Sequence, residues 1–186
     1  VASQSDEFIL GEKLLSRFAD NGIMTNLDAV YRTDPLNAAQ TNDVLQQALS
    51  AERVRQKNEL DQRLSTGDGQ YFKVDQTGKV VFDMEFIEGK FSGVPQGDRR
   101  LRDFRETVQS IEEAGGLEAF MKLPEQSRNQ ILQGSNLENI ITTRFGSTLK
   151  LVSNLRMIDG KLQNLNSLTT KYQSATDLFS GGRIAE

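Results

Sequence analysis

Residues 147–179 read STLKLVSNLRMIDGKLQNLNSLTTKYQSATDLF, and this stretch decides the predicted fold. Its apolar residues recur at steps of three and four, namely Leu151, Leu155, Ile158, Leu162, Leu165, Leu168, Tyr172 and Ala175. That spacing places all of them on one face of an α-helix. An isolated helix gains little stability without a partner for its apolar face. We therefore expect this stripe to contact other helices of the chain, a second copy or another protein.

The back of the same helix is unusually rich in amides and hydroxyls, among them Asn154, Asn166, Thr169 and Gln173. Solvated helix faces more often carry Glu and Lys, which form pairs four residues apart. One interpretation is an ordinary surface helix. The other is a face that touches a protein, because amides and hydroxyls pair there without the desolvation cost of full charges.

The dipeptide Asp159-Gly160 interrupts this pattern. Glycine inside a helix costs about 1 kcal/mol relative to alanine, so we expect a bend or a break at Gly160. Either the helix folds back there, or its far end is covered by another chain. For the second case the sequence predicts protein binding through Leu162, Leu165, Leu168 and Tyr172.

Composition narrows the classes of function. The chain has 186 residues, which is long enough for one domain with a real core, and its net charge is −4. That charge does not favour nucleic acid as a partner. No apolar run approaches the roughly 18 residues that a membrane-spanning helix needs.

Neither cysteine nor histidine occurs in the sequence. Disulfides, thiolate zinc sites and cysteine nucleophiles are thereby excluded, and so is the commonest general base. We infer no catalytic residue, cofactor, metal or small-molecule substrate. An enzyme built on this chain would have to use carboxylates, Lys, Arg, Ser or Tyr.

Helical periodicity predicts further helices, over Phe8–Phe18, Met24–Tyr31, Thr41–Leu64 and Leu101–Ile111. The second half of the third, from Glu52 to Arg63, is almost wholly polar, and we expect it on the surface. We predict a mostly α fold: a multi-helix bundle with one embedded antiparallel β-hairpin at about 71–87 and a long C-terminal amphipathic helix.

The hairpin follows from a change of period from helical to two, with a short glycine-containing loop at Gln76-Thr77-Gly78. A lone hairpin is marginal in water, so its apolar face must rest on the helices. That face is predicted to hold Phe72, Val74, Val80, Phe82, Met84 and Phe86. Residues 66–97 are predicted to form an insertion between the helical parts of a single domain, 1–186.

Four arginines, Arg99, Arg100, Arg102 and Arg105, cluster at the start of one predicted helix. Cations at a helix N-terminus oppose the helix dipole, which makes the cluster anomalous. The functional interpretation is a patch for an acidic protein partner or a phosphate group. The alternative is a solvated face, with Asp98, Asp103 and Glu106 as local partners.

Paired carboxylates are one of the routes to catalysis that the composition leaves open. Asp83 and Glu85 share the outer face of the predicted hairpin and could do acid–base work as a pair. The alternative is a plain solvated strand face. Neither a phosphate-binding loop nor a calcium loop is present in the sequence.

The last three residues, Ile184-Ala185-Glu186, resemble the site at which the prohead protease of T4-like tailed phages cuts, which is Ile or Leu, any residue, then Glu. The resemblance covers three residues, and Ile111-Glu112-Glu113 matches the same pattern inside the chain. Because the chain begins at Val1, we expect either a processed product, as in a matured virion protein, or an expressed fragment.

These observations favour a non-catalytic module that binds protein or assembles with itself, such as a component of a tailed-phage virion or of a secretion apparatus. A secreted effector or regulator that binds one target protein through the arginine face is the alternative. A carboxylate-based enzyme is the second alternative. Solution mass separates the first two, because assembly predicts self-association and an effector predicts a monomer.

Overall fold

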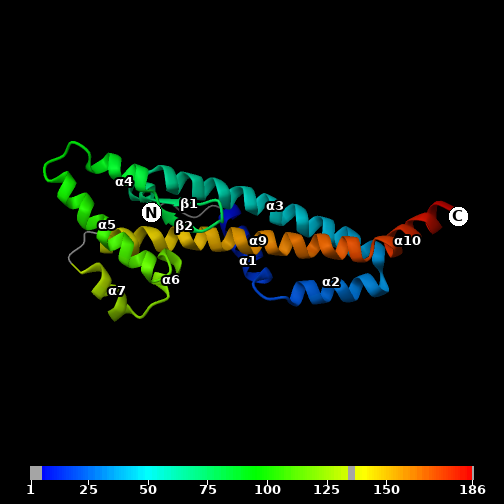
Figure 1. The fold of residues 1–186 in the computed structure, drawn as a ribbon. Helices are drawn as coiled ribbons and strands as arrows, with labels where there is room; N and C mark the ends of the chain where they lie inside the picture. Colours follow the sequence, from blue (N-terminus) through cyan, green and yellow to red (C-terminus); the bar gives the residue numbers. More distant parts are fainter. Residues whose placement is uncertain (1–5, 134–136, 186) are drawn as a thin grey trace. The chain divides into compact units, whose positions relative to one another are not determined.

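The computed structural model describes residues 6–133 and 137–185 and confirms a mostly α fold with one β-hairpin and a long C-terminal helix (Figure 1). The chain divides into two compact units. Unit 1 comprises Val1–Lys57 and Ser153–Glu186, and unit 2 comprises Asn58–Val152. The predicted 66–97 insertion is thus part of a larger unit, and helices α3 (Pro35–Ser65) and α9 (Gly146–Lys171) contribute residues to both.

Among the described residues of unit 1, every regular element is a helix. It contains α1 (Asp6–Phe18), α2 (Gly22–Thr33), the first part of α3, the second part of α9 and α10 (Gln173–Ala185). In this unit the first part of α3 runs beside α9 (Figure 1). The two are joined by Asn42, which is buried and donates to the Tyr31 hydroxyl at 3.0 Å and to the Leu165 carbonyl at 2.8 Å. The unit's core gathers Leu15, Phe18, Leu27, Tyr31, Ala38, Leu49, Ile158 and Leu165.

Helix α9 passes through Gly160 without a break, so the predicted interruption at Asp159-Gly160 is wrong. Both neighbours of Gly160 are anchored. Asp159 pairs with Arg53 at 2.6 Å, and the buried Lys161 donates to the Asn21 side chain at 2.6 Å. These contacts outweigh the modest helix propensity cost of one glycine. The helical path is interrupted instead at Tyr172, between α9 and α10.

Gly160→Ala should therefore stabilise unit 1. A Cβ at this position would meet nothing within 4 Å, and helical alanine is favoured over glycine by roughly 0.5–1 kcal/mol. Urea unfolding followed by circular dichroism measures the gain. Gly11→Ala is the opposite control, since its Cβ would lie 2.2 Å from the carboxylate of buried Glu52. A loss of stability in Gly160→Ala would show that α9 needs its glycine.

The polar half of α3 is partly buried. Glu52 and Gln56 are 6% and 2% exposed, against the expectation that this half lies on the surface. The Glu52 carboxylate accepts hydrogen bonds from the Arg55 guanidinium, with Nε at 3.0 and 3.1 Å, and from the Gln56 amide at 2.9 Å. Buried polar groups survive when they are paired in this way, so residue polarity alone mispredicts their burial.

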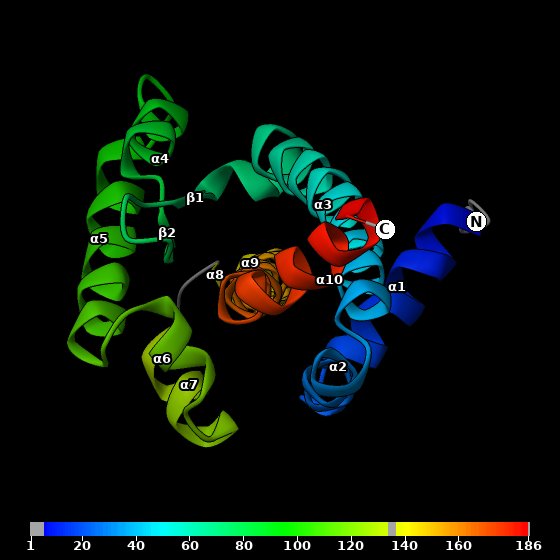
Figure 2. The same ribbon diagram turned by 90° about the vertical axis from the view of Figure 1, so that its right-hand side faces the viewer.

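Unit 2 holds the hairpin and the short helices. After the second part of α3 come the 3₁₀ turn η1 (Gly67–Tyr71), β1 (Phe72–Val74), β2 (Val80–Phe82), α4 (Met84–Phe91), α5 (Gly97–Glu113), α6 (Leu117–Met121) and α7 (Glu125–Leu132). Then α8 (Leu137–Ile140) and a π-helical turn, η2 (Ile141–Phe145), lead into α9. Helices α4 and α5 lie side by side (Figure 2).

The hairpin is confirmed, but it is shorter than predicted. Antiparallel pairing joins Phe72 to Phe82 and Val74 to Val80. Met84 and Phe86 belong to α4, because the Asp83 side chain accepts from the Phe86 amide at 3.2 Å and so caps a helix. Met84 and Phe86 are therefore helical, and the buried residue of this helix is Ile87.

The hairpin's apolar face rests on the helices of its own unit, as predicted, except at Val74, which is 36% exposed. Phe72 lies with its ring centroid 5.5 Å from that of Phe145, and Phe82 lies 5.6 Å from Phe104. Aromatic pairs at these separations add stability beyond the area they bury. The core of unit 2 is thus aromatic and is built across the hairpin, α5 and η2.

Candidate functional site

The four arginines of the predicted binding patch differ in their ion pairing. Arg105 pairs with Glu88 on α4 at 2.5 Å. Arg99, Arg100 and Arg102 are exposed, and none forms an ion pair with another residue in the described ranges 6–133 and 137–185. The expected local pairing with Asp98, Asp103 and Glu106 is therefore absent there. Three adjacent cations on the first turns of α5 are left available to solvent or to a partner.

The predicted binding stripe on α9 lies against the core of unit 1. Leu165 is fully buried, and Leu162, Leu168 and Tyr172 are half-buried against the same core. Its intrachain contacts satisfy the need of the apolar face for a partner. Protein binding through these four residues stays a prediction, and for Leu165 it would require the unit to open.

A polar cluster fixes the end of α9 on α2. The Tyr172 hydroxyl donates to the Asp28 carboxylate at 2.8 Å, and the Lys171 ammonium donates to the same oxygen at 3.1 Å. The Tyr172 ring stacks on Tyr31 with centroids 4.7 Å apart. The hydrogen bond from Tyr172, then that from Lys171, lowers the pKa of the Asp28 carboxyl below its ordinary value. Folding of unit 1 therefore favours the ionised form of Asp28.

Asp28 should make unit 1 less stable in acid. Because its pKa is lower in the folded state, its contribution is fully present above the unfolded pKa of about 3.9 and is lost as pH falls through the folded value. Urea unfolding of the native chain and of Asp28→Asn, at neutral pH and near pH 3, tests this. We expect the native chain to be the more stable at neutral pH and the difference to shrink in acid. A difference that is independent of pH would contradict the role of the charge.

The amide-rich back of α9 and α10 partly lines a groove in unit 1. Its volume is about 320 Å³. The lining residues are Tyr31, Ala39, Asp43, Gln46, Asn166, Thr169, Gln173 and Thr176. Three of these eight, Asn166, Thr169 and Gln173, are among the amides and hydroxyls named from the sequence on the back of the predicted helix. Asp43 and Gln46 on α3 were missed, because nothing in the sequence indicates which part of α3 lies beside α9.

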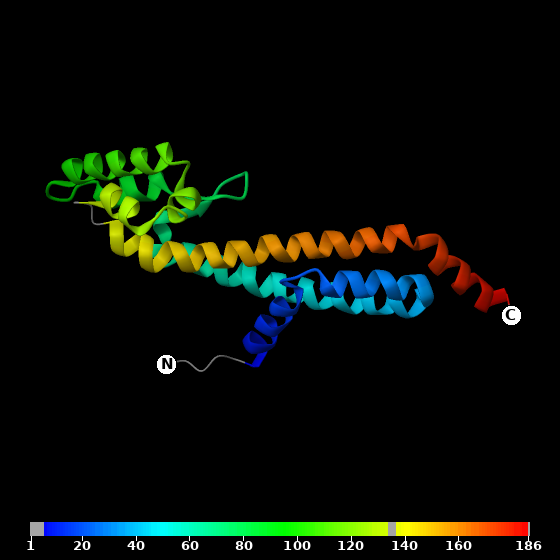
Figure 3. The ribbon, with the colours of Figure 1, turned by 90° about the horizontal axis from the view of Figure 1, so that it is seen from below.

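Helix α10 carries two exposed apolar residues side by side. Leu178 is 73% exposed and Phe179 is 52% exposed. The helix projects past the turn between α2 and α3 within unit 1 (Figure 3). Soluble proteins seldom leave adjacent large apolar side chains in water without a use for them. The helical stripe predicts that apolar residues continue toward this end of the chain.

The predicted carboxylate pair does not lie on a strand face. Asp83 caps α4, and Glu85 is exposed in the first turn of that helix. Among the described residues no group of three or more acidic side chains is placed to hold a metal ion. No described helix is both long enough and apolar enough to cross a bilayer.

Comparison with protein-family models, with curated proteins and with solved structures gave no match for this chain.

Proposed function

We propose that this chain is a non-catalytic protein-binding module that assembles with copies of itself through α10. The observation that carries the proposal is the exposure of Leu178 and Phe179, at 73% and 52%, on one projecting helix. Identical apolar faces on two copies can cover each other about a two-fold axis, with Phe179 of one copy against the same helix of the next. Aromatic anchors of this kind dominate the energy of many interfaces.

The biological setting belongs to the same proposal. A component of a larger assembly, such as a tailed-phage virion or a secretion apparatus, would use such a contact to join its neighbours. The prohead-protease resemblance of Ile184-Ala185-Glu186 stays a prediction, because Glu186 lies outside the described residues and the side chains of residues 181–185 are not described.

Sedimentation velocity over a wide concentration range tests the assembly. We expect the native chain to associate as concentration rises and the Leu178→Gln, Phe179→Asn double variant to remain monomeric, because its α10 no longer offers an apolar face. Val54→Gln is the matched control, since Val54 is 59% exposed on α3 but stands between two charged residues, Arg53 and Arg55. A native chain that stays monomeric throughout would contradict assembly through α10.

That monomeric outcome would favour the second candidate function, an effector or regulator that binds one target protein. The observation behind it is the set of exposed arginines on α5, Arg99, Arg100 and Arg102, without ion-pair partners among the described residues. Exposed guanidinium groups that are not already paired can engage acidic side chains of a partner in bidentate fashion. The sedimentation experiment thus decides between the two candidates.

A further inference from the structure

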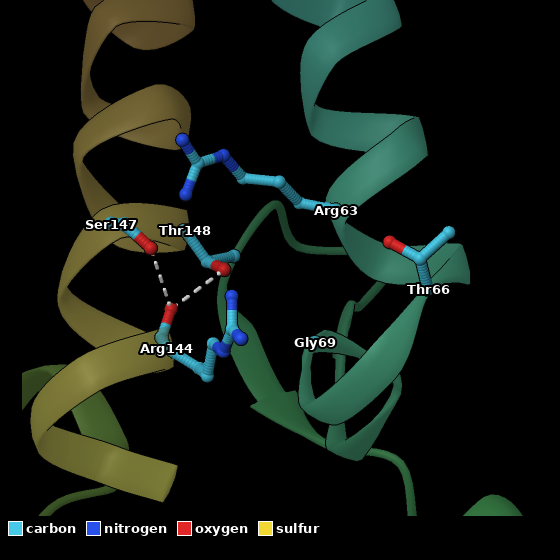
Figure 4. A pocket seen from close by; sticks show the side chains of 6 residues that line it. All are labelled: Arg63, Thr66, Gly69, Arg144, Ser147 and Thr148. Carbon is cyan, nitrogen blue, oxygen red and sulfur yellow. Dashed lines mark hydrogen bonds between the residues drawn. The ribbon is translucent and has the colours of Figure 1, made fainter. Parts of the chain in front are cut away.

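A small pocket in unit 2 collects two arginine side chains. Arg63 reaches it from α3, and Arg144 reaches it from the π turn η2, with both guanidinium groups directed into the space between the two helices (Figure 4). Thr66, Gly69, Ser147 and Thr148 complete the lining. The pocket volume is about 40 Å³, and all six residues belong to unit 2.

The charges of this pocket are unbalanced. Among the described residues, its lining contains two cations and no acidic residue. Arg63 has one ionic contact, to Glu59 at a loose 3.6 Å, and Arg144 has no ion-pair partner within the described part of the chain. Like charges that share a pocket repel each other. A bound anion would remove the repulsion and accept hydrogen bonds from both guanidinium forks.

The walls of the pocket are fixed by hydrogen bonds and by close backbone contact. The hydroxyls of Thr148 and Ser147 donate to the Arg144 carbonyl at 2.9 and 3.1 Å, which holds the end of the π turn (Figure 4). π turns within helices frequently mark functional sites. On the opposite wall, a Cβ at Gly69 would lie 1.9 Å from the Arg63 carbonyl, so the backbone there has no room for a side chain.

We propose that this pocket binds one tetrahedral oxyanion, a phosphate or sulfate group. A volume of about 40 Å³ holds on the order of three waters at roughly 10–15 Å³ each, which suits one such group and little else. The group can come from a free ion or from the end of a small monoester, because Arg144 is exposed and leaves the rest of a ligand in solvent. The site is independent of the assembly through α10.

Thermal unfolding and isothermal titration calorimetry test this site with three probes: inorganic phosphate, inorganic sulfate and glycerol 3-phosphate. Sodium chloride at matched ionic strength is the reference. A ligand that binds only the folded state raises the Tm as its concentration rises, so we expect a larger rise with an oxyanion than with chloride. Binding of the free ions indicates a free-ion source, and binding of the ester alone indicates a monoester. Either result supports the site.

Substitutions locate the site. Arg144→Gln should weaken phosphate binding by about tenfold or more, because a bidentate charged contact is lost. Arg144 is exposed, so this variant should fold normally. Arg63→Gln should weaken phosphate binding in the same way. Arg63→Lys keeps the charge but not the forked guanidinium group, so it should bind phosphate with intermediate affinity. The matched control is the triple variant Arg99→Gln, Arg100→Gln, Arg102→Gln, which removes three exposed arginines of unit 2 away from this lining.

The proposal is overturned by any of three results. The first is no oxyanion effect beyond that of chloride. The second is undiminished phosphate binding in Arg144→Gln. The third is loss of binding in the triple variant on α5 while Arg144→Gln retains it, which would move the oxyanion to the α5 arginines.

Discussion

Phe82→Ala is expected to destabilise unit 2 by about 3–5 kcal/mol, the usual range for a buried phenylalanine. Phe82 is 5% exposed, and its ring lies 5.5 Å from that of Phe72 and 5.6 Å from that of Phe104. Truncation to alanine would leave a cavity at the junction between the hairpin and α5. The surrounding rings are held by their own neighbours, Phe72 by Phe145 and Phe104 by Phe91, so the cavity cannot readily collapse.

Urea unfolding followed by circular dichroism measures the change, and hydrogen exchange of the amides from Tyr71 to Phe82 assigns it to unit 2. Val74→Ala is the matched control, because Val74 belongs to the same hairpin but is 36% exposed. Its effect should stay within about 0.5 kcal/mol, as is usual for exposed positions. A loss below about 1 kcal/mol for Phe82→Ala would mean that the hairpin does not rest on the aromatic core.

Local patterns in the sequence were sufficient to predict elements. The repeat of Leu151, Leu155 and Ile158 predicted the C-terminal helix, and the period of two around Phe72 and Phe82 predicted the hairpin. The end of the hairpin was misplaced because alternation was followed through Met84. Asp83 followed by Glu85 is a helix-start signal that would have corrected it, since an aspartate cap and an acidic first turn favour a helix.

Contacts between distant residues lay beyond any local pattern. Asp28 and Tyr172 are 144 positions apart, and their hydrogen bond fixes the end of α9. The expected break at Gly160 rested on propensity alone, which tertiary contacts override. In the same way, the polarity of Glu52 predicts a surface residue. Hydrogen bonds from Arg55 and Gln56 to its carboxylate allow it to be buried. Arg63 and Arg144 carried no joint signal, because the fold alone brings them into one pocket.

Leu165→Ala is the second substitution with a large expected effect, a loss of about 2–5 kcal/mol from unit 1. Leu165 is fully buried in the core that also holds Leu27, Tyr31 and Leu49, so its truncation leaves a cavity between α9 and the helices around it. Val54→Ala is the matched control in unit 1. Val54 is 59% exposed, and truncating it should change stability by less than about 0.5 kcal/mol.

Hydrogen exchange across Leu162–Leu178 then separates core from interface. In a dilute monomer, the amides from Leu162 to Leu168 should remain protected, because the core of unit 1 covers their side chains without a second copy. Those from Gln173 to Leu178 should gain protection as concentration rises, because α10 is the proposed contact. Loss of protection at Leu162–Leu168 on dilution would make the stripe an interface between chains. Strong protection of the whole segment in the dilute monomer would show that α10 is stable without a second copy and would remove this support for its role in assembly.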